Sequence, residues 1–183
     1  MSELATERVN NKVIDLVSIF KNNINKNNGI SKIDNMLLSA IIAQHNNEPQ
    51  YLILACLFHE LGYYLRNEYS NFHDIHNHNL IATDYLMNLG MNTRVCYLVE
   101  KFLDSKRYLY TINTEMYNDL PHLEKKILDN QGGLMSSDEL FHFELDDEFP
   151  NFVRIIKYNT IKKNKKDLIP IDYFIPLIKR FIS

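Results

Sequence analysis

The side chains best suited to chemistry lie in two neighbouring runs of the chain, residues 54–65 and 73–90. Four of the seven histidines fall inside these runs, and two of the four stand next to a carboxylate. Neutral imidazole and carboxylate both bind borderline divalent metals such as iron, and the end of a helix can aim both groups into one cavity. The spacing therefore predicts a metal site. Its candidate ligands are His59, Glu60, His73, Asp74, His76 and His78.

These candidates also have structural interpretations. His59 ends an apolar helix, so its position suits a hydrogen-bonded structural histidine as well as it suits a ligand. Histidines in a polar loop, here His73 and His76, are more often solvated or pH-sensitive surface groups. A metal site with only three of these ligands is an alternative. His59, Glu60 and His78 have the composition of the two-histidine, one-carboxylate site that leaves open positions on mononuclear Fe(II) for oxygen and substrate.

Composition narrows the function classes. The chain has 183 residues with 45% hydrophobic content, which favours one well-buried core. Its formal net charge is -3, and its lysines and arginines are scattered among acidic residues. The chain therefore lacks the basic surface that binding to nucleic acid requires. No run of 18 apolar residues is present, and no charged segment followed by an apolar run opens the chain. We therefore expect a cytoplasmic protein that binds neither nucleic acid nor a membrane.

Three further features bear on the site. Cys56 and Cys96 lie in apolar stretches forty residues apart, which suits buried free thiols better than a disulfide. The basic run at residues 162–166 is typical of a solvated loop. Tyr63 and Tyr64 follow the His–Glu pair closely, and they could close a ligand pocket with aromatic surface or be ordinary wall residues.

The elements that must position these residues are helices. Only five glycines and five prolines punctuate the chain, and the apolar residues between them recur at spacings of three and four. This pattern predicts an all-α fold, with one domain over residues 1–183 that forms a bundle of about seven to nine helices. We expect the helix and loop of residues 1–29 to pack on the rest of that domain.

Individual helices can be predicted as well. Residues 49–58 form a helix that is apolar nearly all round, as expected of a central helix. A loop is expected over residues 62–72, and a helix over residues 93–104 with a turn or short helix after it. Ser136 and Glu139 form a capping-box pattern, which predicts that another helix starts there.

At several of these residues the chain resembles a known family. The run LFHELG that closes an apolar helix, with a later helix that begins at His78, is similar to the pattern of the HD-domain superfamily of metal-dependent phosphohydrolases and oxygenases. The runs SKRYLYTIN, LDNQGGLMSSDELFHFE and IDYFIPLI resemble the branch of HD-type phosphonate oxygenases, which use a mixed-valent di-iron site. The resemblance extends over residues 30–182 and implies an HD-type helical bundle.

The same resemblance implies six ligand positions, and three of them have lost their donor. The bridging aspartate of the family is a glutamate here, and His76 is close enough in sequence to compete with His78. Two asparagines and a phenylalanine replace the remaining ligands, which implies a degenerate site. Lys106 matches a basic residue that meets the phosphonate, and Tyr63 and Tyr64 stand at the mouth of the site. The six positions are Asn35, His59, Glu60, His78, Phe102 and Asn159.

Three functions are compatible with this sequence. The first is an HD-type protein with an eroded di-metal site that binds a small anionic or amine metabolite, or a partner, without a metal. The second is an iron-dependent oxygenase or phosphohydrolase with a rebuilt site of one or two metals. The third is a non-catalytic interaction module that forms a homodimer. The expected cofactor is accordingly either none or iron, and the expected partner is a small-molecule ligand.

Overall fold

The computed structural model describes residues 3–24, 29–69 and 77–183, and these segments are all-α. The predicted all-α bundle is confirmed, although the described residues form twelve α-helices rather than seven to nine. The α-helices are α1 (Glu3–Asn22), α2 (Lys32–His45), α3 (Gln50–Phe58), α4 (Gly62–Tyr69), α5 (His78–Asn88), α6 (Thr93–Glu100), α7 (Phe102–Ile112), α8 (Thr114–Asn118), α9 (His122–Asn130), α10 (Ser137–Glu144), α11 (Phe149–Thr160) and α12 (Ile175–Phe181). Two 3₁₀ helices, η2 (Lys165–Asp167) and η3 (Ile171–Phe174), precede α12.

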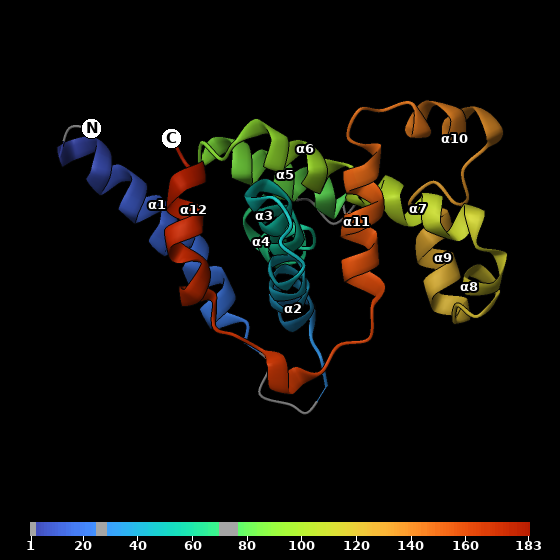
Figure 1. Ribbon diagram of the computed structural model, residues 1–183, viewed down its shortest axis with the longest axis horizontal. Coiled ribbons are helices and arrows are strands. Elements are labelled where there is room, and N and C mark those ends of the chain that lie inside the picture. Colours follow the sequence, from blue (N-terminus) through green and yellow to red (C-terminus); the bar gives the residue numbers. More distant parts are fainter. Residues whose placement is uncertain (1–2, 25–28, 70–76) are drawn as a thin grey trace.

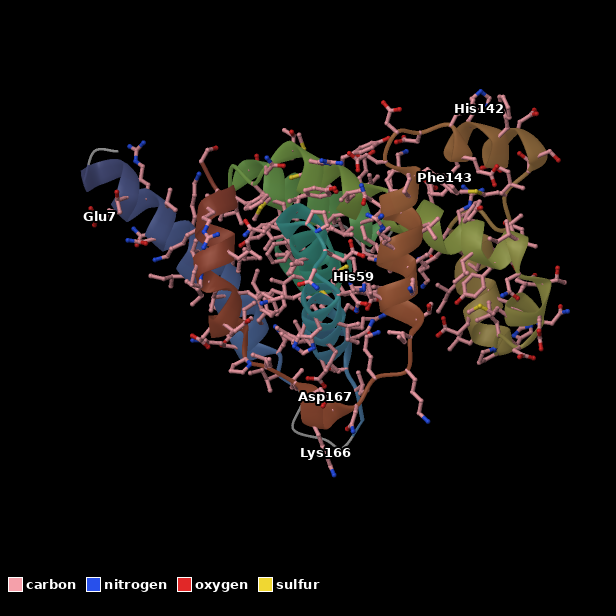
Figure 2. The ribbon with its side chains drawn as sticks, viewed as in Figure 1. Glu7, His59, His142, Phe143, Lys166 and Asp167 are labelled. Atoms are coloured by element: carbon pink, nitrogen blue, oxygen red, sulfur yellow. The ribbon has the colours of Figure 1, made fainter. Side chains whose placement is uncertain are left out.

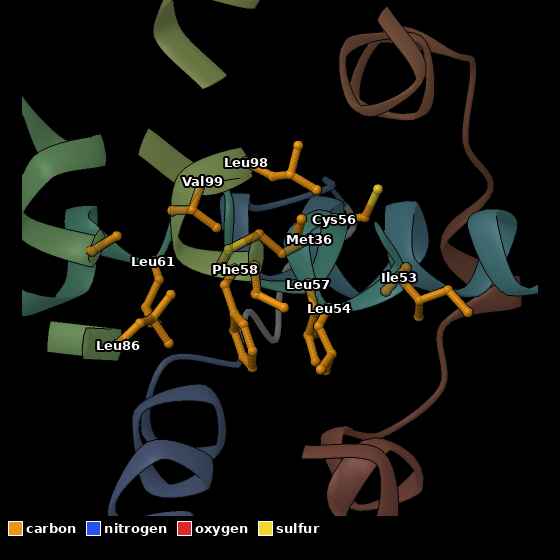
Figure 3. Close-up of a cluster of buried hydrophobic side chains, with 14 of the residues drawn as sticks. Met36, Ile53, Leu54, Cys56, Leu57, Phe58, Leu61, Leu86, Leu98 and Val99 are labelled. Atoms are coloured by element: carbon orange, nitrogen blue, oxygen red, sulfur yellow. The ribbon is translucent and has the colours of Figure 1, made fainter. Parts of the chain in front are cut away.

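Two helices, α2 and α3, pack against each other at the centre of the molecule (Figure 1). A capping box starts α2, because the Ser31 hydroxyl accepts the Asp34 backbone N–H and the Asp34 carboxylate accepts the Ser31 N–H. Residues 52–58 of α3 are all buried, and Figure 3 shows Leu57 and Phe58 in the apolar cluster they form. The prediction of a central apolar helix is confirmed.

Other helices enclose this centre. Helix α3 also packs against α6 and α11, while α11 extends to α2 and α7. Helices α1 and α12 lie side by side at one end of the molecule, and α8, α9 and α10 lie at the other end (Figure 1). The predicted capping box of Ser136 and Glu139 starts α10, and Cys56 and Cys96 are buried free thiols as predicted.

The segment after Glu60 differs from the prediction. A loop was expected over residues 62–72, but α4 begins at Gly62. This glycine allows two helices to approach closely, because a Cβ atom there would lie 1.8 Å from the carbonyl oxygen of His78. Leu61 and Leu65, four residues apart, are buried and give this part of the chain an apolar helical face.

The predicted helix over residues 93–104 is also wrong in extent. Helix α6 ends at Glu100, and Lys101 has φ -79° and ψ 2°, outside helical geometry. Helix α7 then starts at Phe102 and includes the segment that was expected to be a turn or short helix. The chain changes direction here because α6 packs on α3 and α5, whereas α7 packs on α11.

The helices of the described segments lack the combination of length and hydrophobicity that a bilayer crossing requires.

Candidate functional site

His59 lies at the C-terminal end of α3, near the centre of the molecule (Figure 2), and its side chain is fully buried. Its Nδ1 is 2.7 Å from the carbonyl oxygen of Cys56, and its Nε2 is 2.8 Å from the side-chain nitrogen of Asn159 in α11. A carbonyl only accepts, so Nδ1 carries the proton of the neutral ring and Nε2 accepts from the Asn159 amide. Both ring nitrogens are therefore bound to protein groups.

Electrostatics supports the neutral form of His59. Burial lowers the pKa of His59 to about 4, although Glu60 and the Cys56 carbonyl act in the opposite direction. At neutral pH the imidazole therefore carries no charge. It serves as a hydrogen-bonded link between α3 and α11.

Glu60 is the next residue and is also buried. Its Oε1 is 3.0 Å from the ammonium nitrogen of Lys32, and its Oε2 accepts the side-chain amide of Asn35 at 3.5 Å. Burial alone would raise the pKa of Glu60, but His59 and Lys32 outweigh this effect and lower the pKa to about 2. Because His59 is neutral at pH 7, Lys32 is the nearest positive charge that keeps Glu60 ionised there.

Phe102 and Lys106 approach from α7. The Phe102 ring is fully buried, and its centroid lies 4.4 Å from that of the His59 ring in an edge-to-face arrangement. Lys106 follows one helical turn later on the same face of α7. Burial lowers the pKa of Lys106, and Glu60 acts in the opposite direction. Helix α7 therefore supplies an apolar wall and a cation that is costly to bury.

His78 is linked to Lys32 through the ring of Tyr63. The buried His78 ring stacks on Tyr63 at a centroid distance of 4.0 Å, and the Lys32 ammonium lies 4.0 Å from the centre of the same tyrosine ring. The Tyr64 hydroxyl oxygen accepts the backbone N–H of Ile33 at 3.2 Å, which ties α4 to the start of α2. Lys32 thus connects the Glu60 and His78 parts of the site.

The structure brings most of the predicted positions together. Asn159 and Phe102 contact His59, and Asn35 contacts Glu60, so the three positions at which the resemblance implies a lost donor lie beside the His–Glu pair. His76, together with His73 and Asp74, lies outside the described residues.

Sequence reasoning missed two lysines. Lys32 could have been suspected, since it stands three residues before Asn35 and therefore on the same helical face.

Lys163 was assigned to a solvated loop, but its ammonium donates to the Asn159 carbonyl oxygen at 2.7 Å. Burial lowers the pKa of Lys163 to about 8, with Cys56 and Glu60 acting in the opposite direction. Lys165 of the same run also turns inward, with its nitrogen 3.3 Å from the buried Asp34 carboxylate.

The residues at these six positions do not fit a di-iron centre. Phe102 has no donor atom, and the Asn159 amide is bound to His59 while the Asn35 amide faces Glu60. Within residues 3–24, 29–69 and 77–183, no three His, Cys, Asp or Glu side chains are grouped so that they could hold a metal ion. Two iron cations need more anionic and imidazole ligands than His59, Glu60 and His78 provide.

No protein-family model matches the chain. It is similar to an uncharacterised protein of Acanthamoeba polyphaga mimivirus, with 26% identity over 178 residues that cover 94% of this chain and 81% of the relative. It is also 26% identical, over 84% of its own length and 80% of the relative's, to the [1-hydroxy-2-(trimethylamino)ethyl]phosphonate dioxygenase (glycine-betaine-forming) of Leisingera caerulea. A hydroxymethylphosphonate dioxygenase of Gimesia maris is 25% identical over 63% of this chain and 59% of the relative. The chain is thus an all-α protein with distant relatives among phosphonate dioxygenases.

Proposed function

We propose that this protein is a divergent member of the HD-type oxygenase group that binds a small anionic metabolite without a metal. The observation that carries this proposal is the bonding of the His–Glu pair. Both nitrogens of His59 and both carboxylate oxygens of Glu60 are already bound to Cys56, Asn159, Lys32 and Asn35. A metal ion would have to displace these protein groups before it could bind.

The charge around Glu60 favours an anionic ligand. Three lysines, Lys32, Lys106 and Lys163, lie close enough for the Glu60 carboxylate to influence the pKa of each. The exposed Glu124 influences the pKa of Lys32 and Lys106 as well, so three lysines and two carboxylates interact in this region. A buried cation is stabilised when an anion approaches it, because the anion offsets the lost hydration. An anionic metabolite would therefore bind where the positive charges exceed the negative ones.

The relatives suggest the first ligands to test. Two of them are named as phosphonate dioxygenases, and a phosphonate carries an anionic, three-oxygen head group. Such a group can accept hydrogen bonds from two ammonium groups at once. Methylphosphonate and inorganic phosphate are therefore suitable probes.

The test is the shift in melting temperature with methylphosphonate, measured for the wild-type protein, Lys106→Met and Lys157→Met. Lys157 is an exposed lysine of α11 and provides the matched control. Lys106→Met removes a charge that burial disfavours, so this variant should remain folded. We expect methylphosphonate to raise the melting temperature of the wild-type protein and of Lys157→Met but not of Lys106→Met. No shift in the wild-type protein would overturn the proposal, as would oxygen consumption with hydroxyphosphonates that increases with iron content.

A further inference from the structure

We propose that the ammonium group of Lys32 replaces the metal cation at Glu60 and donates its remaining N–H bonds to the anionic group of the ligand. The second clause rests on the proposed function, whereas the first stands on the contacts of Lys32 alone. Lys32 lies outside the six positions that the family resemblance implies, and its role follows from where α2 places it.

The first support is charge balance. The side chain of Glu60 is 7% exposed, and a buried carboxylate needs a cation close by to remain ionised. Lys32 supplies this cation at 3.0 Å, while the His59 ring donates to the Cys56 carbonyl and accepts from the Asn159 amide, as a neutral ring does. Where a di-metal centre would need several anionic ligands, one ammonium needs only one carboxylate. The neutral residues at the other positions are consistent with a single positive charge.

The second support is the local placement of Lys32. It is the first residue of α2, where the positive end of the helix dipole disfavours a cation. The capping box of Ser31 and Asp34 fixes this turn of the helix, so that Lys32 and Asn35 both reach Glu60. The unfavourable dipole interaction is offset by the carboxylate. The ion pair with Glu60, and not a contribution to helix stability, therefore explains why a lysine stands at the start of α2.

The third support is access. The Lys32 side chain is 45% exposed, so the ammonium lies between the buried carboxylate and solvent. An ammonium has three N–H donors, of which one points to Glu60. The Tyr63 ring holds the same ammonium at 4.0 Å, which restricts its movement. An anion that enters from solvent would meet Lys32 before it met Glu60, as a substrate meets a metal that keeps an open coordination position.

The test combines anion binding and metal binding. Methylphosphonate affinity is measured by calorimetry for the wild-type protein, Lys32→Met, Lys32→Arg and Lys21→Met, where Lys21 is a control lysine that pairs with an exposed carboxylate. We expect Lys32→Met to lose affinity by about tenfold or more, and Lys32→Arg and Lys21→Met to stay within about threefold of the wild-type protein. Unchanged affinity in a folded Lys32→Met variant would overturn the anion-binding role.

Metal binding tests the replacement itself. The triple substitution Asn35→His, Phe102→His and Asn159→Asp restores metal-binding side chains, and its Co²⁺ affinity is measured with and without the additional substitution Lys32→Met. We expect Co²⁺ to bind about tenfold or more tightly when Lys32→Met is present, because the ammonium no longer occupies Glu60. Equal Co²⁺ affinity in the two proteins would contradict the replacement. Should the triple variant not fold, Asn159→Asp alone is compared in the same way.

The two experiments separate the proposals. If the wild-type protein does not bind methylphosphonate, the proposed function fails while the Co²⁺ comparison still decides whether Lys32 excludes a metal. If Co²⁺ affinity is independent of Lys32, the replacement fails while the anion data still decide the proposed function.

Discussion

Two lysine–carboxylate pairs in different regions of the molecule show what burial does to an ion pair. Lys21 of α1 and Asp172 of η3 are 2.6 Å apart, and their side chains are 49% and 51% exposed. Lys32 and Glu60 are 3.0 Å apart, and their side chains are 45% and 7% exposed. The two lysines are almost equally exposed, so the pairs differ mainly in the burial of the carboxylate.

By distance alone, the Lys21–Asp172 ion pair would be the stronger of the two. Water screens that pair, however, and can solvate either partner when the other is removed. Glu60 has no comparable access to water, so its charge depends on Lys32 and Asn35. The Lys32–Glu60 pair, although longer, is therefore expected to contribute more than the Lys21–Asp172 pair, both to the free energy of unfolding and to ligand binding at the site.

The largest loss of stability is expected at Gly62, where α4 and α5 pack too closely to accommodate a side chain. Gly62→Ala would place a Cβ atom against the His78 carbonyl oxygen and force α4 away from α5. We expect the free energy of unfolding to fall by about 3 kcal/mol or more, as measured by urea denaturation. Gly29→Ala is the control, since a Cβ atom at Gly29 meets nothing within 4 Å. Similar stability of the two variants would mean that the helices adjust at little cost.

The next effect concerns the buried ion pair. Lys32→Met leaves the Glu60 charge without its nearest cation, and we expect it to lower the free energy of unfolding by about 2 kcal/mol. Adding Glu60→Gln removes the unpaired charge and should restore much of this loss. Urea denaturation of the two single variants and the double variant gives the coupling energy. A coupling near zero would place Lys32–Glu60 in the same class as a surface pair.

Acid should weaken the same region. The pKa of His59 is about 4 in the folded protein, below the value of about 6.5 expected when the chain is unfolded. Between these two pH values the unfolded chain binds a proton at His59 and the folded chain does not. The free energy of unfolding should therefore fall as the pH drops from about 6.5 towards 4, by at most about 1.4 kcal/mol per pH unit. Glu60 adds to this loss only below about pH 4.5, its unfolded value.

The acid effect is checked by urea denaturation of the wild-type protein and His59→Asn between pH 7.5 and 5. The asparagine can still donate to the Cys56 carbonyl but cannot be protonated in this range. Its stability should depend less on pH than that of the wild-type protein. Equal slopes would assign the acid sensitivity to other groups.

The smallest effect is expected for the exposed pair. Lys21→Met should change the free energy of unfolding by no more than about 0.5 kcal/mol. Added salt should reduce even this difference, because exposed charges are screened. A loss as large as that of Lys32→Met would show that burial of the carboxylate does not distinguish the two pairs.

The sequence predicted those parts of the fold that depend on local signals. The apolar helix that ends at His59 and the capping box at Ser136 follow from patterns within a few residues, and both are confirmed. The helix that begins at Gly62 was predicted to be a loop, and its glycine is explained by close packing against His78, which lies sixteen residues later in the chain.

The site could be predicted only in part. His59 and Glu60 stood out by type, and the family resemblance indicated Asn35, Phe102 and Asn159, which the structure places around them. The spacing of Lys32 to Asn35 places both on one face of α2, but neither the partner of Lys32 nor that of Lys163 could be assigned from the sequence. Their contacts depend on how the start of α2 and the end of α11 approach Glu60 and Asn159, and no short-range pattern in the chain encodes that approach.

The central claim is that Lys32 and Asn159, rather than metal ions, satisfy Glu60 and His59. Its most direct test is the metal content of the wild-type protein purified from cells grown with added iron and manganese, beside the variants His59→Ala and His78→Ala. We predict far less than one equivalent of any transition metal in all three proteins. One equivalent or more of iron in the wild-type protein, lost in both variants, would contradict the claim and indicate a rebuilt metal site.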